Sequence, residues 1–169
     1  MLEVKFKKLV PEAKIPAYAK PGDAGLDLTA TSKRWSDDFQ CFVYGTGLAV
    51  EIPEGYVGLI FPRSSIRKYC LALTNCVGVI DSGYRGEWKI MLTNVNKYPV
   101  EFSHDVDKVT YIKGKIFKNK IKKVIYPLTK AIAQAVVIPL PTIQCYCDKD
   151  MVDGAKSNRG ETGWGASGK

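Results

Sequence analysis

The segment FPRSSIRK, at residues 61–68, has the residue types of a phosphate-binding turn. Arg63 follows an apolar stretch and precedes the hydroxyl groups of Ser64 and Ser65. An arginine can donate two parallel hydrogen bonds to phosphate oxygens, and backbone N–H groups in a turn add further donors. A solvated surface turn explains the segment equally well when it is taken alone.

The segment TNCVGVIDSGYRGEW, at residues 74–88, holds a carboxylate that could act as a base. Asp81 ends an apolar run with the pattern of a hairpin, and Tyr84 follows three residues later. A carboxylate accepts a proton from water at neutral pH when the two are within hydrogen-bonding reach. A structural aspartate that caps its own turn is the alternative.

Two more segments carry weaker signals. Asp27 follows a turn of small residues in PGDAGLDL (21–28), where an aspartate usually bonds to its own backbone. Gln134 interrupts the apolar run AIAQAVVIPLP (131–141), where a cross-strand hydrogen bond is the simplest explanation. Neither segment indicates a function alone.

The elements that must position these side chains are strands. Most of the chain is rich in β-branched and aromatic residues, punctuated by turn signals such as Pro53-Glu54-Gly55, and no long stretch has helical periodicity. The N-terminal segment 2–8 alternates apolar and charged residues, which predicts an edge strand. Two strands joined by the Pro53-Glu54-Gly55 turn are expected within 46–61, and further strands are expected at 86–95, 122–128 and 133–147. The pattern predicts an all-β sandwich or jelly roll.

Composition limits the class of protein. The chain has 169 residues, 46% of them hydrophobic and 25% charged, which is typical of one globular domain and excludes a collagen-like or wholly disordered chain. Five cysteines cannot all pair and lack C-x2-C spacing, so we expect free thiols in a reducing cytoplasm. No targeting or membrane-spanning segment is expected. The net charge of +8 favours an anionic partner.

Two regions differ from this background. Residues 104–123 hold seven lysines against two aspartates, which indicates a basic insert. Residues 148–169 are rich in glycine and cannot build a core, which predicts a mobile arm. We therefore divide the chain into a β-barrel domain at 1–147, including the insert, and a C-terminal arm at 148–169.

Taken together, five segments resemble the signature motifs of the trimeric dUTPases in order and spacing. The motifs are AGLDL, PRSSI, NCVGVIDSGYRGE, IAQ and RGETGWGASG. The resemblance implies a distorted jelly-roll β-barrel. It also implies hydrolysis of dUTP to dUMP and pyrophosphate with Mg2+ as cofactor, which keeps uracil out of DNA and supplies dUMP for thymidylate synthesis. An insert between the third and fourth motifs resembles those of phage-type members.

The resemblance also assigns roles to residues. Asp81 would activate the water that attacks the α-phosphorus, Gln134 would help to place that water, and Asp27 would orient waters around Mg2+. Tyr84 would pack beneath the deoxyribose. The residues that would bind substrate are Arg63, Ser64, Ser65, Asn75, Gly78, Val79, Ile80, Asp81, Tyr84, Lys89, Arg159, Trp164 and Gly165.

Within that set, the hairpin from Asn75 to Asp81 and the backbone of Lys89 would recognise uracil. In the arm, Arg159 would hold the γ-phosphate and Trp164 would cover the base. Three subunits would form three sites at their interfaces. The fourth motif departs from the family because Ala131 precedes Ile132-Ala133-Gln134 where a cation is usual.

Three alternatives stay open on sequence grounds. A dCTP deaminase shares the fold and an R-S-S motif, but the glutamate that it needs ten residues after Asp81 is replaced by Met91, whose thioether cannot shuttle protons. A basic module could bind nucleic acid or a regulatory protein through residues 108–123, although solvated lysines are the simpler interpretation. Cys145 and Cys147 could share a strand face, but zinc would need further ligands.

Overall fold

The computed structural model describes residues 2–95, 100–102, 109–111 and 126–147. Most of the predicted basic insert, with His104, lies outside the described residues. The predicted arm at 148–169, with Arg159, Trp164 and Gly165, also lies outside them.

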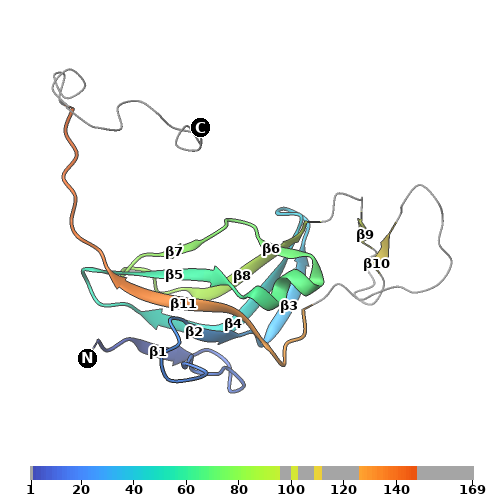
Figure 1. Ribbon diagram of the computed structural model, residues 1–169, viewed down its shortest axis with the longest axis horizontal. Helices are drawn as coiled ribbons and strands as arrows, with labels where there is room; N and C mark the ends of the chain where they lie inside the picture. The colour runs from blue at the N-terminus through green and yellow to red at the C-terminus, as the bar shows by residue number, and fades with distance from the viewer. Residues whose placement is uncertain (1, 96–99, 103–108, 112–125, 148–169) are drawn as a thin grey trace, which may run out of the picture.

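Among the described residues, the first of the two larger antiparallel sheets has the strand order β1-β4-β8-β6, with β3 also paired to β4 (Figure 1). Its strands are β1 (Lys5–Lys8), β3 (Ser32–Ser36), β4 (Cys41–Glu51), β6 (Leu71–Leu73) and β8 (Glu87–Asn94). The strand β1 pairs with β4 and stands at the end of this order, which confirms the predicted N-terminal edge strand.

The second sheet has the order β2-β11-β5-β7 and carries most of the motif residues. Its strands are β2 (Leu26–Thr29), β5 (Tyr56–Pro62), β7 (Gly78–Ile80) and β11 (Ala131–Pro139). A 3-10 helix, η1 (Ser64–Tyr69), follows β5 directly. A separate two-stranded pair consists of β9 (Val100–Phe102) and β10 (Val109–Tyr111).

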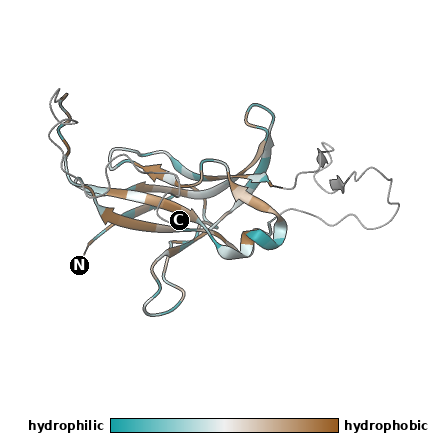
Figure 2. Ribbon diagram, turned by 45° about the horizontal axis from the view of Figure 1, so that its top comes forward, coloured by the Kyte–Doolittle hydropathy of each residue, from teal (hydrophilic) through white to brown (hydrophobic). Residues whose placement is uncertain are grey.

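The core lies between the two sheets, and Figure 2 shows brown, apolar ribbon along their strands and teal in many of the turns. On β8, the buried side chains of Trp88, Ile90 and Leu92 alternate with more exposed ones, as the two-residue period of a strand requires. Each such apolar side chain contributes about 1.5–3 kcal/mol when it is fully buried. The result is an all-β fold with little helix, as the sequence predicted.

Two local predictions have different outcomes. The turn at Pro53-Glu54-Gly55 is present between β4 and β5, and Gly55 has a φ of 79°, which glycine adopts without strain. The strand predicted through residue 147 is wrong beyond Pro139, because residues 140–147 have no strand pairing with the described part of the chain.

Among the described residues, no helix has the length and apolar character that crossing a bilayer requires.

Candidate functional site

The second sheet brings three predicted site residues together through strand register. Gln134 on β11 lies opposite Asp27 on β2 and opposite Phe61 on β5. Its amide Nε2 donates to the carbonyl oxygen of Pro62 at 3.3 Å, immediately before Arg63. Asp27, Gln134 and Arg63 therefore form one polar cluster at this end of the sheet.

Two interactions fix Arg63 within the cluster. Its Nε lies 3.2 Å from Asp27 Oδ1, and its Nη1 donates to the carbonyl oxygen of Ala131 at 3.2 Å. The side chains of Arg63 and Asp27 remain 34% and 28% exposed, so solvent or a ligand can still reach them. A half-exposed guanidinium with its orientation set in this way is suited to an anion such as phosphate.

The serines of the second motif begin η1. Ser64 is exposed, whereas Ser65 is half-buried and its hydroxyl lies 2.7 Å from that of Tyr126. The backbone N–H of Ile66 donates to the carbonyl oxygen of Arg63, which closes the first turn. The two serines therefore follow Arg63 directly, in a turn that a backbone hydrogen bond from Ile66 closes.

A second group of predicted residues surrounds a cavity of about 430 Å³ between the end of β7 and strand β8. Five of the predicted residues line it: Val79, Ile80, Asp81, Tyr84 and Lys89. Asp81 is exposed, and its carbonyl oxygen accepts a hydrogen bond from the backbone N–H of Tyr84 at 3.1 Å, so the two residues share one turn. The hydroxyl of Tyr84 donates to the carbonyl oxygen of Glu87 at 3.1 Å.

Asn75 and Gly78 are not among the residues that line this cavity. Asn75 is exposed in the turn after β6, and Cys76 beside it has a φ of 60°. Gly78 pairs with Ile60 on β5 and is buried. A methyl group on Gly78 would lie 3.2 Å from Ile60 Cβ, so this position holds the two strands close together.

The two groups of residues lie at opposite ends of β5 in one chain. Ile80 pairs with Gly58, so Asp81 lies opposite Val57, whereas Arg63 follows the last residue of β5. Arg63 comes six residues after Val57, which corresponds to about 20 Å along the strand. Figure 1 shows the same separation, because β7 ends at the side of the sheet away from η1.

Several residues of the cavity were not predicted. Arg34, Phe39, Val43, Glu87 and Met91 also line it. Glu87 and Met91 could have been inferred from strand alternation, because they lie on the same face of β8 as Lys89. Arg34, Phe39 and Val43 come from the β3–β4 hairpin, and no local signal connects them to the third motif.

Glu87 also stabilises the local backbone. Its Oε1 accepts a hydrogen bond from the N–H of Gly47 at 2.8 Å, and its Oε2 lies 3.7 Å from Lys89 Nζ. Gly47 lies in the interval where the register of β4 against β8 shifts. The carboxylate therefore satisfies a donor that the irregular ladder leaves without a strand partner.

The buried residue Tyr126 was also not predicted as a functional residue, and its backbone bonds to the buried phenol of Tyr44. The Tyr126 N–H donates to Tyr44 Oη at 3.1 Å, and burial raises the pKa of Tyr44 to about 12.

Burial likewise raises the pKa of the Cys41 thiol. All five cysteines are free, as expected.

The described residues contain no group of three or more histidine, cysteine or acidic side chains that could hold a metal ion. The carboxylate of Asp27, half-buried beside Arg63, is the acidic group nearest the predicted phosphate-binding turn in the polar cluster. One carboxylate is compatible with Mg2+, which retains several waters and takes further oxygen ligands from phosphates.

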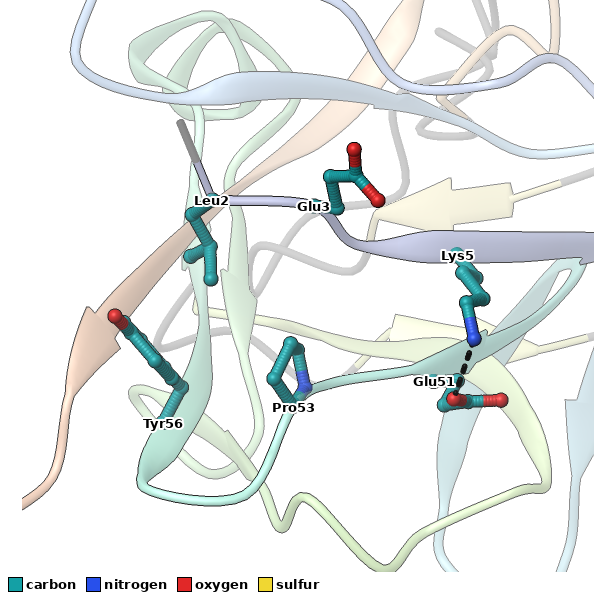
Figure 3. Close-up of a pocket in the computed structure, with 6 residues that line it drawn as sticks. All are labelled: Leu2, Glu3, Lys5, Glu51, Pro53 and Tyr56. Carbon is teal, nitrogen blue, oxygen red and sulfur yellow. Dashed lines mark hydrogen bonds and ion pairs between the residues drawn. The ribbon is translucent and has the colours of Figure 1, made fainter.

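Another cavity, of about 640 Å³, lies beside the N-terminal strand and contains no motif residue (Figure 3). It is lined by Leu2, Glu3, Lys5, Glu51, Pro53 and Tyr56. Lys5 Nζ lies 3.2 Å from Glu51 Oε1 at its edge, which ties β1 to β4. The cavity has no part in the predicted chemistry.

Comparison with known proteins agrees with this geometry. The model of the dUTPase family matches residues 11–109. A deoxyuridine 5'-triphosphate nucleotidohydrolase of Streptomyces coelicolor is 44% identical over 96 residues, which are 56% of this chain and 52% of the relative. A second one, from Leifsonia xyli subsp. xyli, is 29% identical over 159 residues, 92% of this chain and 86% of the relative.

The chain thus spans about half the length of the Streptomyces relative. Among solved structures, a mutant of the Staphylococcus bacteriophage 80alpha dUTPase with dUpNHpp is similar along nearly its whole length. The TM-score is 0.70 at 28% identity, and the match covers 99% of each chain.

Proposed function

Because the chain belongs to the dUTPase family, by a match over more than half of its residues, we propose that it hydrolyses dUTP to dUMP and pyrophosphate. The observation that carries the proposal is the strand register that gathers Asp27, Gln134 and Arg63 into one cluster. This cluster combines a cation for phosphate, a carboxylate and an amide, and it comes from three separate motifs.

The base of the proposed reaction is Asp81, which would take a proton from the water that attacks the α-phosphorus. Support comes from its exposure at the edge of the 430 Å³ cavity, beside Tyr84 and Ile80. An exposed carboxylate in a turn fixed by backbone hydrogen bonds can hold a water in one direction. Gln134 would orient the same water or the α-phosphate.

Uracil and deoxyribose would occupy the cavity between β7 and β8. A slot made by strand backbone has fixed donors and acceptors, which would mismatch cytosine, and little room for the methyl group of thymine. The ring of Tyr84, 44% exposed, would pack under the sugar and oppose a ribose 2′-hydroxyl. Met91 lines the same cavity, which disfavours deamination of dCTP because a thioether transfers no proton.

The phosphates would be bound by Arg63 and the turn of Ser64 and Ser65. The hydroxyl donor beside the α–β bridging oxygen would stabilise the charge of the leaving group, where a donor lowers the barrier most. Mg2+, when bound to the triphosphate, would neutralise phosphate charge. Asp27 would accept hydrogen bonds from the waters of that ion.

We propose that a homotrimer completes this site, with sites at the subunit interfaces. The separation of about 20 Å between Asp81 and Arg63 along β5 supports this, because the α-phosphorus and its neighbouring phosphates span far less. Asp81 of one subunit and Arg63 of another would therefore belong to the same site.

The remaining parts of the proposal concern residues outside the described ranges. The barrel domain at 1–147 would carry the arm at 148–169, which would bring Arg159, Trp164 and Gly165 over bound nucleotide. The lysine-rich insert, about 104–123, would be peripheral to catalysis. The protein would act in the cytoplasm, or in the cytoplasm of a host cell if a phage encodes it.

The test is pyrophosphate release from dUTP, dTTP, dCTP and UTP, each with Mg2+, under identical conditions. We expect release from dUTP at a kcat/KM at least about a hundredfold above that for the other three, since a site built around substrate polar groups rejects mismatches strongly. Comparable rates with dTTP or UTP would refute the proposed nucleoside pocket. Ammonia release from dCTP would show a deaminase instead.

A further inference from the structure

Tyr126 connects the phosphate-binding turn to strand β11 through its hydroxyl group. Tyr126 Oη donates to the carbonyl oxygen of Ala131 at 2.9 Å and lies 2.7 Å from Ser65 Oγ. The same Ala131 carbonyl accepts from Arg63 Nη1 at 3.2 Å. A carbonyl oxygen has two lone pairs, so it can hold both donors at once.

Counting protons fixes the direction of the bond between the two hydroxyls. A phenol has one O–H, and that of Tyr126 is donated to Ala131. Ser65 must therefore donate its own proton to Tyr126 Oη. The Ser65 hydroxyl then has no proton left for a phosphate oxygen, and Ser64, exposed at the start of η1, is the serine that can donate one.

Tyr126 itself is held firmly. Its side chain is 1% exposed, and its N–H and carbonyl groups both bond to Tyr44 Oη, at 3.1 and 3.4 Å. Its ring lies 4.9 Å, centroid to centroid, from that of Tyr69 at the end of η1. A buried side chain with its backbone fixed in this way can transmit position to Ser65.

We propose that Tyr126 is a positioning residue, which fixes Ser65 and Arg63 against the Ala131 carbonyl so that the turn presents its donors to phosphate. The inference rests on the proposed function. It assigns distinct roles to the two serines: the Ser64 hydroxyl donates to phosphate, whereas the Ser65 hydroxyl anchors the turn. Tyr126 does not touch the substrate in this arrangement.

The test is a double-mutant cycle of Tyr126→Phe and Ser65→Ala, measured as kcat/KM for dUTP and as the Kd for inorganic pyrophosphate. We expect each single variant to lose about tenfold in both quantities, because a phosphate turn released from its anchor loses alignment. The double variant should lose no more than Tyr126→Phe alone, because that substitution already removes the bond to Ser65. Tyr69→Phe is the matched control, since its ring packs on Tyr126 but its hydroxyl is not in the chain of bonds, and it should behave as the wild type.

A purely structural role would lower the melting temperature and leave kcat/KM and the pyrophosphate Kd unchanged well below it. That result, or losses in the double variant that multiply those of the singles, would overturn the inference. If the wild type released no pyrophosphate from dUTP, the proposed function would fail. The pyrophosphate Kd values would then decide the inference alone: a tenfold weakening in Tyr126→Phe supports it and an unchanged value overturns it.

Discussion

The Gly86→Ala substitution should displace Tyr84 without disturbing the fold. A Cβ on Gly86 would lie 2.5 Å from Tyr84 Cζ and 2.9 Å from Cε2, and closer still to Oη. Carbon atoms in van der Waals contact are about 3.5–4.0 Å apart, so the ring must retreat by about 1 Å. The ring is 44% exposed and can do so by rotating into solvent.

The cost in stability should be small. Moving the ring breaks the hydrogen bond from Tyr84 Oη to the carbonyl oxygen of Glu87, which is solvent-exposed and contributes at most about 1 kcal/mol. In a chain of this size that corresponds to roughly 2–4 °C in melting temperature. Gly86 does not have a positive φ, so alanine adds no backbone strain.

The cost in activity should be much larger. A misplacement of about 1 Å in a residue that positions substrate typically lowers the rate by roughly a hundredfold. We therefore expect kcat/KM for dUTP to fall by about that factor and the preference for dUTP over UTP to narrow. The assay is pyrophosphate release with both nucleotides, together with thermal unfolding of each variant.

Gly83→Ala is the matched control, because a Cβ there would meet no atom within 4 Å and Gly83 also lacks a positive φ. It lies in the same turn and should keep the activity and selectivity of the wild type. If Gly86→Ala matched Gly83→Ala in both quantities, the position of Tyr84 would have no part in nucleotide selection.

Three more predictions concern other parts of the molecule. Asp81→Asn should lower kcat by about 10²–10⁴-fold while Kd for dUTP stays within a few-fold; wild-type turnover would exclude Asp81 as the base. Gly25→Ala should lower kcat roughly tenfold, because its Cβ would lie 2.9 Å from Gln134 Oε1 and displace that amide. An unchanged kcat in steady-state assays with dUTP would contradict this. The free energy of unfolding should fall between pH 10 and about 12, because burial raises the pKa of Tyr44 from 10.0 to about 12 and the unfolded chain loses that proton first. Urea unfolding at several pH values should show a smaller fall in Tyr44→Phe than in the wild type. An equal dependence on pH in the two proteins would refute the assignment.

The motif residues of the candidate site could be predicted because each motif is local in sequence. The β5 strand, η1 and the turn after β7 place Arg63, Ser64, Asp81 and Tyr84 by short-range geometry. The all-β class also followed from residue types and turn signals. These features depend on neighbours within a few residues, which one sequence displays directly.

Contacts that depend on strand register could not be predicted in the same way. The sequence does not show that Gln134 lies between Asp27 and Phe61, or that Tyr126 reaches Ser65 across 61 residues. Such contacts are set by which strands pair, a choice made by the whole core. The strand predicted through residue 147 was wrong for the same reason, since β propensity alone does not supply a partner.

Subunit complementation tests most directly the claim that one dUTP site is built from two copies of the chain. Asp81→Asn and Arg63→Ala subunits, each inactive alone, are refolded together from denaturant and assayed for pyrophosphate release from dUTP. If Asp81 of one copy serves the Arg63 cluster of another, about a quarter of the sites in randomly mixed trimers carry both intact residues, and activity should return to roughly that fraction of the wild type. Activity no higher than the sum of the two separate variants would contradict the shared site.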